Sequence, residues 1–268
     1  QRPFTASGPF FHPTDPVPDY PDAWKTNLIS DAERILQGCI RYYAYHWQVI
    51  GTPPNWFLNP FNGKAWPADR QHWTDITDFH TDLGDIKHIW EASRLEWTVT
   101  LARAYAVSGQ NVFLDTLNQW LGDWVMKNPV NTGPNWKCGQ EASIRIFNLL
   151  LASHILKQTQ NPSPALQEYV YRHLERISAN IRYAVAQDNN HGTSEAAALF
   201  IGGLWCSGSA SKDSITAEKC GRFAREGRKW LENRVHKLVE EDGSFSQHSV
   251  TYHRVLLDTL IFAEFWRR

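Results

Sequence analysis

The 268-residue sequence lacks any run of about 18 apolar residues, the length that a membrane-spanning helix needs. It also lacks an excess of charge of either sign, since 27 lysine and arginine residues stand against 28 aspartate and glutamate residues. A nearly neutral protein has no broad field that attracts nucleic acid or an anionic membrane. We therefore expect no nucleic-acid partner and no membrane insertion, and an acidic partner must be met by a local cleft.

Cysteine is scarce, and it is scattered without the C-x-x-C spacing of a zinc site or the density of a disulfide framework. The four cysteines are Cys39, Cys138, Cys206 and Cys220. We predict no metal and no cofactor, and the composition leaves the redox compartment open. The chain begins at Gln1 without a methionine or a basic and apolar leader, so we expect a processed or excised product of a periplasmic or secreted protein.

Aromatic residues are abundant: 13 tryptophan, 13 phenylalanine and 9 tyrosine residues occur in a chain that is 42% hydrophobic. A chain of this length and composition can bury the full core of one large domain. Tryptophan is highly buried on average, so most of these side chains are expected in the core. The others can line a groove, because the face of an indole stacks on the apolar face of a sugar ring.

The sequence reads as helices joined by short breaks, with no alternating strand pattern. We predict an irregular N-terminal arm over residues 1–28, a second irregular stretch over 53–67, and a single all-α domain over 1–268. Short connections imply antiparallel hairpins, and without a consensus repeat these favour an incomplete α/α toroid. The last helical pattern stops without a cap, so we expect truncation there. The predicted helices are 30–49, 85–107, 111–126, 139–157, 164–186, 191–206, 216–239 and 247–266.

Two helical segments carry charged residues at i, i+4, i+7 spacing. Lys87, Glu91 and Arg94 form the first stripe, beside an apolar face. It is either a ladder of surface ion pairs or a cleft wall that presents cations to a carboxylated sugar. The second stripe begins with Glu141 and Arg145 on a helix that is apolar nearly all round. Because buried charges need partners or a ligand, it is either an internal network or a substrate groove with Trp136 at its mouth.

Two polar turns lead into helices. In the first, Asn190 precedes His191 and Glu195, and the simplest interpretation is that Asn190 caps the helix. His191 and Glu195 at i, i+4 are a satisfied pair, or two metal ligands that lack a third. In the second turn, His248 and Tyr252 are predicted one turn apart on the same helix face. A tyrosine there is ordinarily a core residue with its hydroxyl satisfied.

Taken in order, these blocks resemble the helical domain of heparinase II/III-like polysaccharide lyases, a superfamily that also contains alginate lyases. The resemblance runs from Trp56 to His253. The blocks that carry it are Trp56 with Asn59-Pro60; Asp85-Ile86-Lys87 with Trp90-Glu91 and Arg94; Asn128-Pro129 with Asn135-Trp136, Glu141 and Arg145; Asn190-His191 with Glu195; and Asp242-Gly243-Ser244 with Tyr252-His253.

The resemblance implies an incomplete α/α toroid that an antiparallel β-sheet domain follows in the family. It implies that Asn190 neutralises the carboxylate of a uronic acid, that His191 assists, and that Tyr252 protonates the leaving glycosidic oxygen. The implied partner is an acidic polysaccharide or oligosaccharide. The β-sheet domain, which supplies a further catalytic histidine in the family, lies outside this chain, and Gln247 or His248 stands where an acidic residue is often found. The expected substrate-binding residues are Trp136, Glu141, Arg145, Lys87, Glu91, Arg94, Glu195, His248 and His253.

The chemistry explains why such residues are needed. β-Elimination removes the C5 proton next to a carboxylate, and this proton is acidic enough only while the negative charge of that carboxylate is offset. Asparagine and histidine donors do this without a metal. A base near C5 and an acid near O4 complete the set, and a tyrosine beside cations such as Arg145, His248 or His253 can serve. We expect Asn190, His191 and Tyr252 to converge on one cleft.

Three other functions fit the same residues. A uronate C5-epimerase would abstract the same proton and return it to the opposite face without cutting the chain. A toroid glycoside hydrolase would need two carboxylic acids about 6.5–9.5 Å apart for inversion, and the candidates are Glu91, Glu141 and Glu195. A glycan-binding module without catalytic activity would bind oligosaccharide and form no product.

Overall fold

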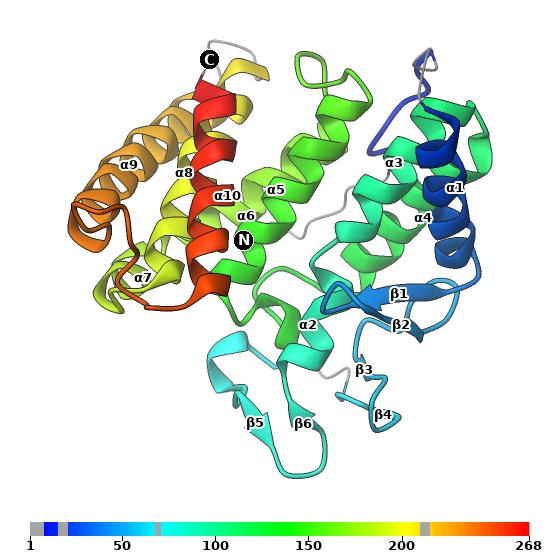
Figure 1. Ribbon diagram of the computed structural model, residues 1–268, viewed down its shortest axis with the longest axis horizontal. Coiled ribbons are helices and arrows are strands. Elements are labelled where there is room, and N and C mark those ends of the chain that lie inside the picture. Colours follow the sequence, from blue (N-terminus) through cyan, green and yellow to red (C-terminus); the bar gives the residue numbers. More distant parts are fainter. Residues whose placement is uncertain (1–7, 16–20, 68–70, 210–214, 268) are drawn as a thin grey trace. The chain divides into compact units, whose positions relative to one another are not determined.

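The computed structural model (Figure 1) describes residues 8–15, 21–67, 71–209 and 215–267. It is mostly helical and contains three small two-stranded sheets among the described residues. The all-α fold class predicted from the sequence is therefore confirmed. Closure into a toroid and the single-domain organisation stay predictions.

The chain divides into two compact units. The first unit consists of Gln1–Glu141 and Asn148–Glu168, and the second consists of Ala142–Phe147 and Tyr169–Arg268. Helix α5 (Gly139–Ile155) contributes residues to both units, and so does α6 (Pro164–Ser178).

The first unit contains, in chain order, α1 (Asp22–Leu36), β1 (Cys39–Tyr42), β2 (His46–Val49), β3 (Leu58–Asn59), β4 (Lys64–Ala65), η1 (Trp73–Asp75), β5 (Phe79–His80), β6 (Gly84–Asp85), α2 (Lys87–Ser93), α3 (Glu96–Ser108), α4 (Asn111–Lys127) and η2 (Pro134–Trp136). The strands pair antiparallel as β1 with β2, β3 with β4 and β5 with β6.

Tryptophan side chains form much of the core of the first unit. Trp56 stacks on Trp97 with ring centroids 5.9 Å apart, and Trp97 meets the ring of Trp120 edge-on at 5.4 Å. Several of the buried indole N–H groups have acceptors: that of Trp56 donates to Asp123, and that of Trp124 donates to Ser93. The expectation that most tryptophans are core residues holds for these side chains, because a buried indole satisfies its one donor internally.

The second unit contains α7 (Ile181–Ala186), α8 (Asn190–Ser209), α9 (Ile215–Leu238) and α10 (Val250–Arg267). Helices α8 and α9 pack along each other, and α10 packs against α8 (Figure 1). Their closeness depends on glycine, since a Cβ on Gly203 would lie 2.5 Å from the backbone nitrogen of Ala224. A disulfide between Cys206 and Cys220 joins the same two helices.

Three predicted helices are wrong in their bounds or their type. Segment 30–49 is the end of α1 followed by the β1–β2 hairpin, and α1 already begins at Asp22, inside the predicted arm. Gly38, at φ +84°, ends this helix where a Cβ would lie 2.8 Å from the carbonyl oxygen of Gly51. Segment 85–107 is broken at Leu95, which has φ +64°, and segment 164–186 is broken between α6 and α7. Parts of the predicted arm, residues 1–7 and 16–20, lie outside the described residues.

Helices α4 and α5 confirm their predictions closely, because each carries a continuous apolar pattern bounded by clear breaks. None of the helices in the described part of the chain is long and apolar enough to cross a membrane.

Candidate functional site

In the first unit, the guanidinium of Arg94 lies between two carboxylates. Its Nε and Nη2 atoms donate to the two oxygens of Glu141 at 2.8 and 2.9 Å, and its Nη1 atom donates to Glu91. The two glutamate side chains are only 5–6% exposed, whereas that of Arg94 is 29% exposed. The arrangement is a bidentate ion pair extended by a second carboxylate, and Arg94 is its solvent-facing member.

The two carboxylates of this cluster hold Arg94 in its charged form. Burial alone would lower the pKa of Arg94, but the hydrogen-bonded carboxylates of Glu141 and Glu91 outweigh it and raise that pKa above its ordinary value. Two further contacts fix the cluster: the backbone N–H of Tyr43 donates to Glu91 at 2.8 Å, and the side chain of Asn148 donates to the carbonyl of Arg94 at 2.9 Å. Removal of the arginine would leave two buried carboxylates without their cation.

The predicted stripes are thus only partly realised. Glu91 and Arg94 do interact, but Lys87 is exposed and lies 3.6 Å from Asp85. Glu141 pairs with Arg94, which is 47 residues away in sequence. Trp136 is 2% exposed, and its indole N–H donates to the carbonyl of Asn128. Its prediction as a sugar contact at the mouth of a groove stays untested.

Arg145 belongs to the second unit and is fully buried. Its Nε donates to Nε2 of His173 at 2.8 Å, and Nδ1 of His173 lies 2.8 Å from the carbonyl oxygen of Tyr169. Since Nε2 accepts, the ring carries its proton on Nδ1 and donates it to that carbonyl. Burial, and then the charge of Arg145, lower the pKa of His173 well below its usual range, in agreement with a neutral ring. Sequence reasoning missed His173, because a single histidine in a helical pattern has no distinguishing spacing.

The two polar turns of the second unit are joined by one hydrogen bond. The side-chain oxygen of Gln247 accepts the backbone N–H of Asn190 at 2.8 Å. The helix-capping contact comes from the preceding residue, since Asn189 Oδ1 accepts the N–H of His191 at 2.9 Å. The sequence predicted that Asn190 caps helix α8, but the capping residue is Asn189. Asn190 is 3% exposed.

His191 and Glu195 face each other within the first turns of α8. Nδ1 of His191 lies 3.8 Å from a carboxyl oxygen of Glu195, and their side chains are 32% and 5% exposed. Burial raises the pKa of Glu195 to about 8, although the nearby charge of Arg176 opposes this. At neutral pH this carboxyl group is therefore mostly uncharged. The described residues contain no group of three or more histidine, cysteine, aspartate or glutamate side chains that could hold a metal ion.

Tyr252 lies in the first turn of α10 and is 43% exposed, so it is not sealed in the core. No side chain or backbone group in the described part of the chain contacts its hydroxyl at hydrogen-bond distance, which leaves the phenol open to solvent or a ligand. His248 precedes the helix in a left-handed conformation with φ +36°. The prediction that His248 and Tyr252 share a helix face is therefore wrong, because α10 begins only at Val250. His253 is half-buried in the first turn of this helix.

Comparison with known proteins agrees with this fold. Heparan sulfate lyase HepC from Pedobacter heparinus superposes with a TM-score of 0.58 at 19% sequence identity, over 93% of this chain and 35% of that chain. A mutant of the same enzyme gives 0.57 at 18% identity, over 92% and 34%. No curated protein sequence matches the chain at a significant level. The chain thus has the fold of one part of a heparan sulfate lyase and spans about a third of that protein's length.

The family described as Heparinase II/III N-terminus matches residues 55–266. This match covers most of the chain and includes the Arg94 cluster and both polar turns of the second unit. The chain belongs to the heparinase II/III family. The resemblance inferred from the ordered sequence blocks is confirmed.

Proposed function

We propose that this chain is the helical part of a polysaccharide lyase that cleaves a uronic-acid-containing polysaccharide by β-elimination. The observation that carries the proposal is the hydrogen bond from the backbone of Asn190 to Gln247, because it ties together the turns that bear the proposed carboxylate-binding and acid residues. Tyr252 follows Gln247 by five residues and presents an exposed phenol.

The first task of the site is to offset the charge of the substrate carboxylate. In this proposal the side-chain amide of Asn190 donates to the substrate carboxylate, while its backbone N–H donates to Gln247. His191 provides a second donor from a partly exposed ring. Fixed donors aimed at developing negative charge stabilise the enolate-like intermediate without reorganisation during the reaction.

Glu195 supports this role by being neutral. An ionised carboxylate beside His191 would repel the carboxylate of the sugar, but burial raises the pKa of Glu195 to about 8. At pH 7 the polymer therefore meets a protonated acid rather than a charge of its own sign. We infer that anionic substrate binds less well as the pH rises through this pKa.

The second task is to move protons. The C5–H bond breaks and its electron pair forms the C4=C5 double bond, while the C4–O4 bond breaks and its electrons leave with the glycosidic oxygen. Tyr252 donates its phenolic proton to that oxygen. We propose that a base from residues beyond this chain takes the C5 proton, because the matched lyase structures are about three times as long as the chain.

The glycoside hydrolase alternative is disfavoured by the Arg94 cluster. Glu91 and Glu141 both accept hydrogen bonds from the guanidinium of Arg94, so their oxygens are already engaged within the protein. An inverting hydrolase needs one protonated and one ionised carboxyl group facing the scissile bond. In the elimination reaction the same cluster has a simpler use: Arg94, its exposed member, contacts an acidic group of the polymer.

We also propose a periplasmic or secreted location. The support is the disulfide between Cys206 and Cys220, because structural disulfides persist mainly in oxidising compartments. Thiol titration of the denatured, unreduced native protein should find Cys39 and Cys138 reactive and the other two protected. Four reactive thiols would remove this support.

Product analysis tests the function. The full-length protein is incubated with polymers that contain glucuronate, iduronate, mannuronate or guluronate, and the products are examined by near-ultraviolet absorbance and mass spectrometry. Elimination predicts products that absorb in the near ultraviolet, because they contain a C4=C5 double bond. Their mass should lack the water molecule that hydrolysis would add at each cut. Polymer that keeps its length but changes its uronate configuration would indicate an epimerase, absorbance-free fragments would indicate a hydrolase, and binding without products would indicate a glycan-binding module. Each of these three results contradicts the proposal.

A further inference from the structure

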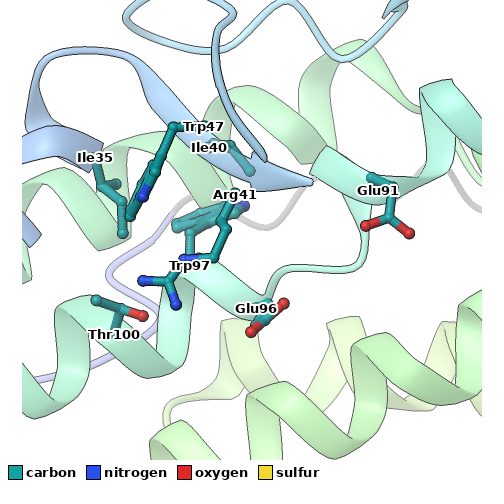
Figure 2. A pocket seen from close by; sticks show the side chains of 8 residues that line it. All are labelled: Ile35, Ile40, Arg41, Trp47, Glu91, Glu96, Trp97 and Thr100. Atoms are coloured by element: carbon teal, nitrogen blue, oxygen red, sulfur yellow. The ribbon is translucent and has the colours of Figure 1, made fainter. Parts of the chain in front are cut away.

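A pocket of about 50 Å³ lies in the first unit, between the β1–β2 hairpin and the start of α3 (Figure 2). Two tryptophans, Trp47 and Trp97, provide much of its wall, and Arg41 reaches from β1 toward the part of α3 that bears Glu96 and Thr100 (Figure 2). Arg41 and Trp47 are direct cross-strand partners, so the hairpin register sets their spacing. A pocket with aromatic walls and a few convergent polar groups has the composition of a small-ligand site.

Several polar groups of the residues that line this pocket form no hydrogen bond with other described residues. Within the part of the chain that the structure describes, Arg41 has one hydrogen-bond partner, the carboxylate of Asp31. That contact uses Nη2 and leaves Nε and Nη1 to donate elsewhere. The carboxylate of Glu96 and the hydroxyl of Thr100 form no hydrogen bond or ion pair with any described residue, and neither does the indole N–H of Trp47. Residues that carry such donors and an acceptor thus line one small space.

The charges that line the pocket select the type of ligand. Of the charged residues that line it, Glu91 is paired with Arg94 and Arg41 is paired with Asp31, whereas Glu96 forms no ion pair with a described residue. A carboxylate or sulfate group would therefore meet an excess of its own sign. A hydroxyl group carries no charge, and it both donates to Glu96 and accepts from Arg41 or Trp47. The matching ligand is the uncharged, hydroxyl-bearing edge of a sugar ring.

The size of the pocket limits how much of a ligand enters. A single water needs about 10–15 Å³ of such volume, so 50 Å³ admits a few water-sized groups and not a whole ring. One edge of a sugar with two adjacent hydroxyl groups fits this space. The rest of the sugar ring then lies outside, beside the half-buried Trp47, whose indole centroid lies 4.7 Å from the guanidinium of Arg41 and 5.4 Å from that of Arg34.

We propose that Arg41, Trp47, Glu96 and Thr100 form a sugar-binding subsite for a neutral residue of a polysaccharide. It is distinct from the Asn190, His191 and Tyr252 site of the second unit. Arg41 and Trp47 precede residue 55, where the match to the heparinase II/III family begins, so half of this subsite comes from sequence outside that match. The proposal does not depend on the elimination reaction, because its test measures binding.

The test uses a matched pair of probes, methyl β-glucopyranoside and methyl β-glucuronide, which differ only in whether C6 is a hydroxymethyl or a carboxylate group. The protein carries ¹⁵N-labelled tryptophan, and the indole signals are assigned with the variants Trp47→Phe and Trp97→Phe. We expect a saturable shift of the Trp47 signal with the glucoside at millimolar concentration. The glucuronide should bind several-fold more weakly.

Two variants assign the effect to the pocket. Glu96→Gln keeps an acceptor and removes the charge, so the preference for the glucoside over the glucuronide should fall toward one. Thr100→Val keeps the shape and removes the hydroxyl, which should weaken glucoside binding about fivefold, the equivalent of one hydrogen bond. The control is Glu232→Gln, which alters an exposed glutamate paired with Arg228 in the second unit and should change nothing.

Folding of each variant is checked by circular dichroism. The changes at Trp47, Glu96 and Thr100 are at half-buried or exposed positions and are expected to preserve the fold, whereas Trp97 is buried and its variant serves only for signal assignment. The proposal is overturned if Trp47 shows no saturable shift with the glucoside, or if the glucuronide binds the wild-type protein as tightly. It is also overturned if folded Glu96→Gln and Thr100→Val both behave like the wild type. If the full-length protein forms no elimination product but the glucoside still shifts the Trp47 signal, the proposed function is contradicted and the subsite stands.

Discussion

The side chain of Gln247 accepts the backbone N–H of Asn190 at 2.8 Å, across 57 residues of sequence. Asn190 is the first residue of α8, and the N–H groups of a first helical turn have no partner within their own helix. Gln247 satisfies one of these donors and fixes the loop before α10 at the start of α8. The start of α8 and the loop that leads to Tyr252 therefore have a defined spacing.

Gln247→Ala should release this link. We expect the amide hydrogen of Asn190 to exchange faster and the free energy of unfolding to fall by about 1 kcal/mol, the value of a typical hydrogen bond. Hydrogen exchange and urea unfolding measure the two effects. The control is Gln187→Ala, which removes a local contact with Asn189 at 3.2 Å. Equal exchange of the Asn190 amide in both variants would show that the link is dispensable.

Asn190→Ala and Asn189→Ala should separate binding from helix capping, although the two residues are neighbours. Loss of the Asn190 amide should weaken both oligosaccharide binding and turnover, because the substrate carboxylate is present in the ground state and the transition state alike. Loss of Asn189 removes the capping contact with His191 and should cost about 1 kcal/mol of stability with cleavage retained. The reverse pattern of activities would contradict the assignment of Asn190.

Glu195→Gln should change how stability depends on pH. Since burial raises the folded-state pKa of Glu195 from 4.5 to about 8, the folded protein keeps a proton that the unfolded chain loses in this window. Stability contributed by the protonated group is complete below pH 4.5 and is lost as the pH rises toward about 8, at about 1.4 kcal/mol per pH unit. Urea unfolding at pH 5.0 and 7.5 should show the wild type losing about 3 kcal/mol relative to the variant. Parallel curves would refute the raised pKa.

Arg94→Met should be one of the most damaging single changes in the first unit. It leaves Glu91 and Glu141 buried without a cation, and breaking a buried ion pair in this way costs about 3–5 kcal/mol. Arg228→Met removes one side of an exposed pair with Glu232 and should cost less than about 1 kcal/mol. Thermal unfolding compares the two. A loss of the same small size in both would mean that the cluster is solvated.

Much of the fold could be predicted from helical periodicity, and its failures have local causes. Helices α4 and α5 were predictable because apolar residues recur along them between clear breaks. The break at Leu95 was not, because a leucine with φ +64° carries no sequence signal of a left-handed conformation. The β1–β2 hairpin was missed for a similar reason: its turn places Tyr43 and Ala44 at positive φ, where glycine or asparagine is the usual signal.

In the candidate sites, too, contacts between residues close in sequence could be predicted, and contacts between distant elements could not. The order of motif blocks predicted the family, and the spacing of Glu91 and Arg94 predicted their contact. Periodicity could not predict that Arg94 would also bind Glu141, or that Arg145 would bind His173, because such pairs join elements far apart in sequence. The link from Asn190 to Gln247 is of this kind, and it is the contact on which the proposed site depends most.

The most direct test of the proposed site is the rate at which full-length Tyr252→Phe protein forms unsaturated uronide from a polysaccharide that the wild type cleaves. The change removes one hydroxyl from a half-exposed ring, so packing and oligosaccharide binding should persist. Loss of a group that transfers a proton should lower kcat by about 10²–10⁴-fold. Tyr183→Phe, at an exposed tyrosine of α7, is the control and should retain full activity. More than about a tenth of the wild-type rate in Tyr252→Phe, well above the loss expected for proton transfer, would contradict the role of Tyr252 as the acid.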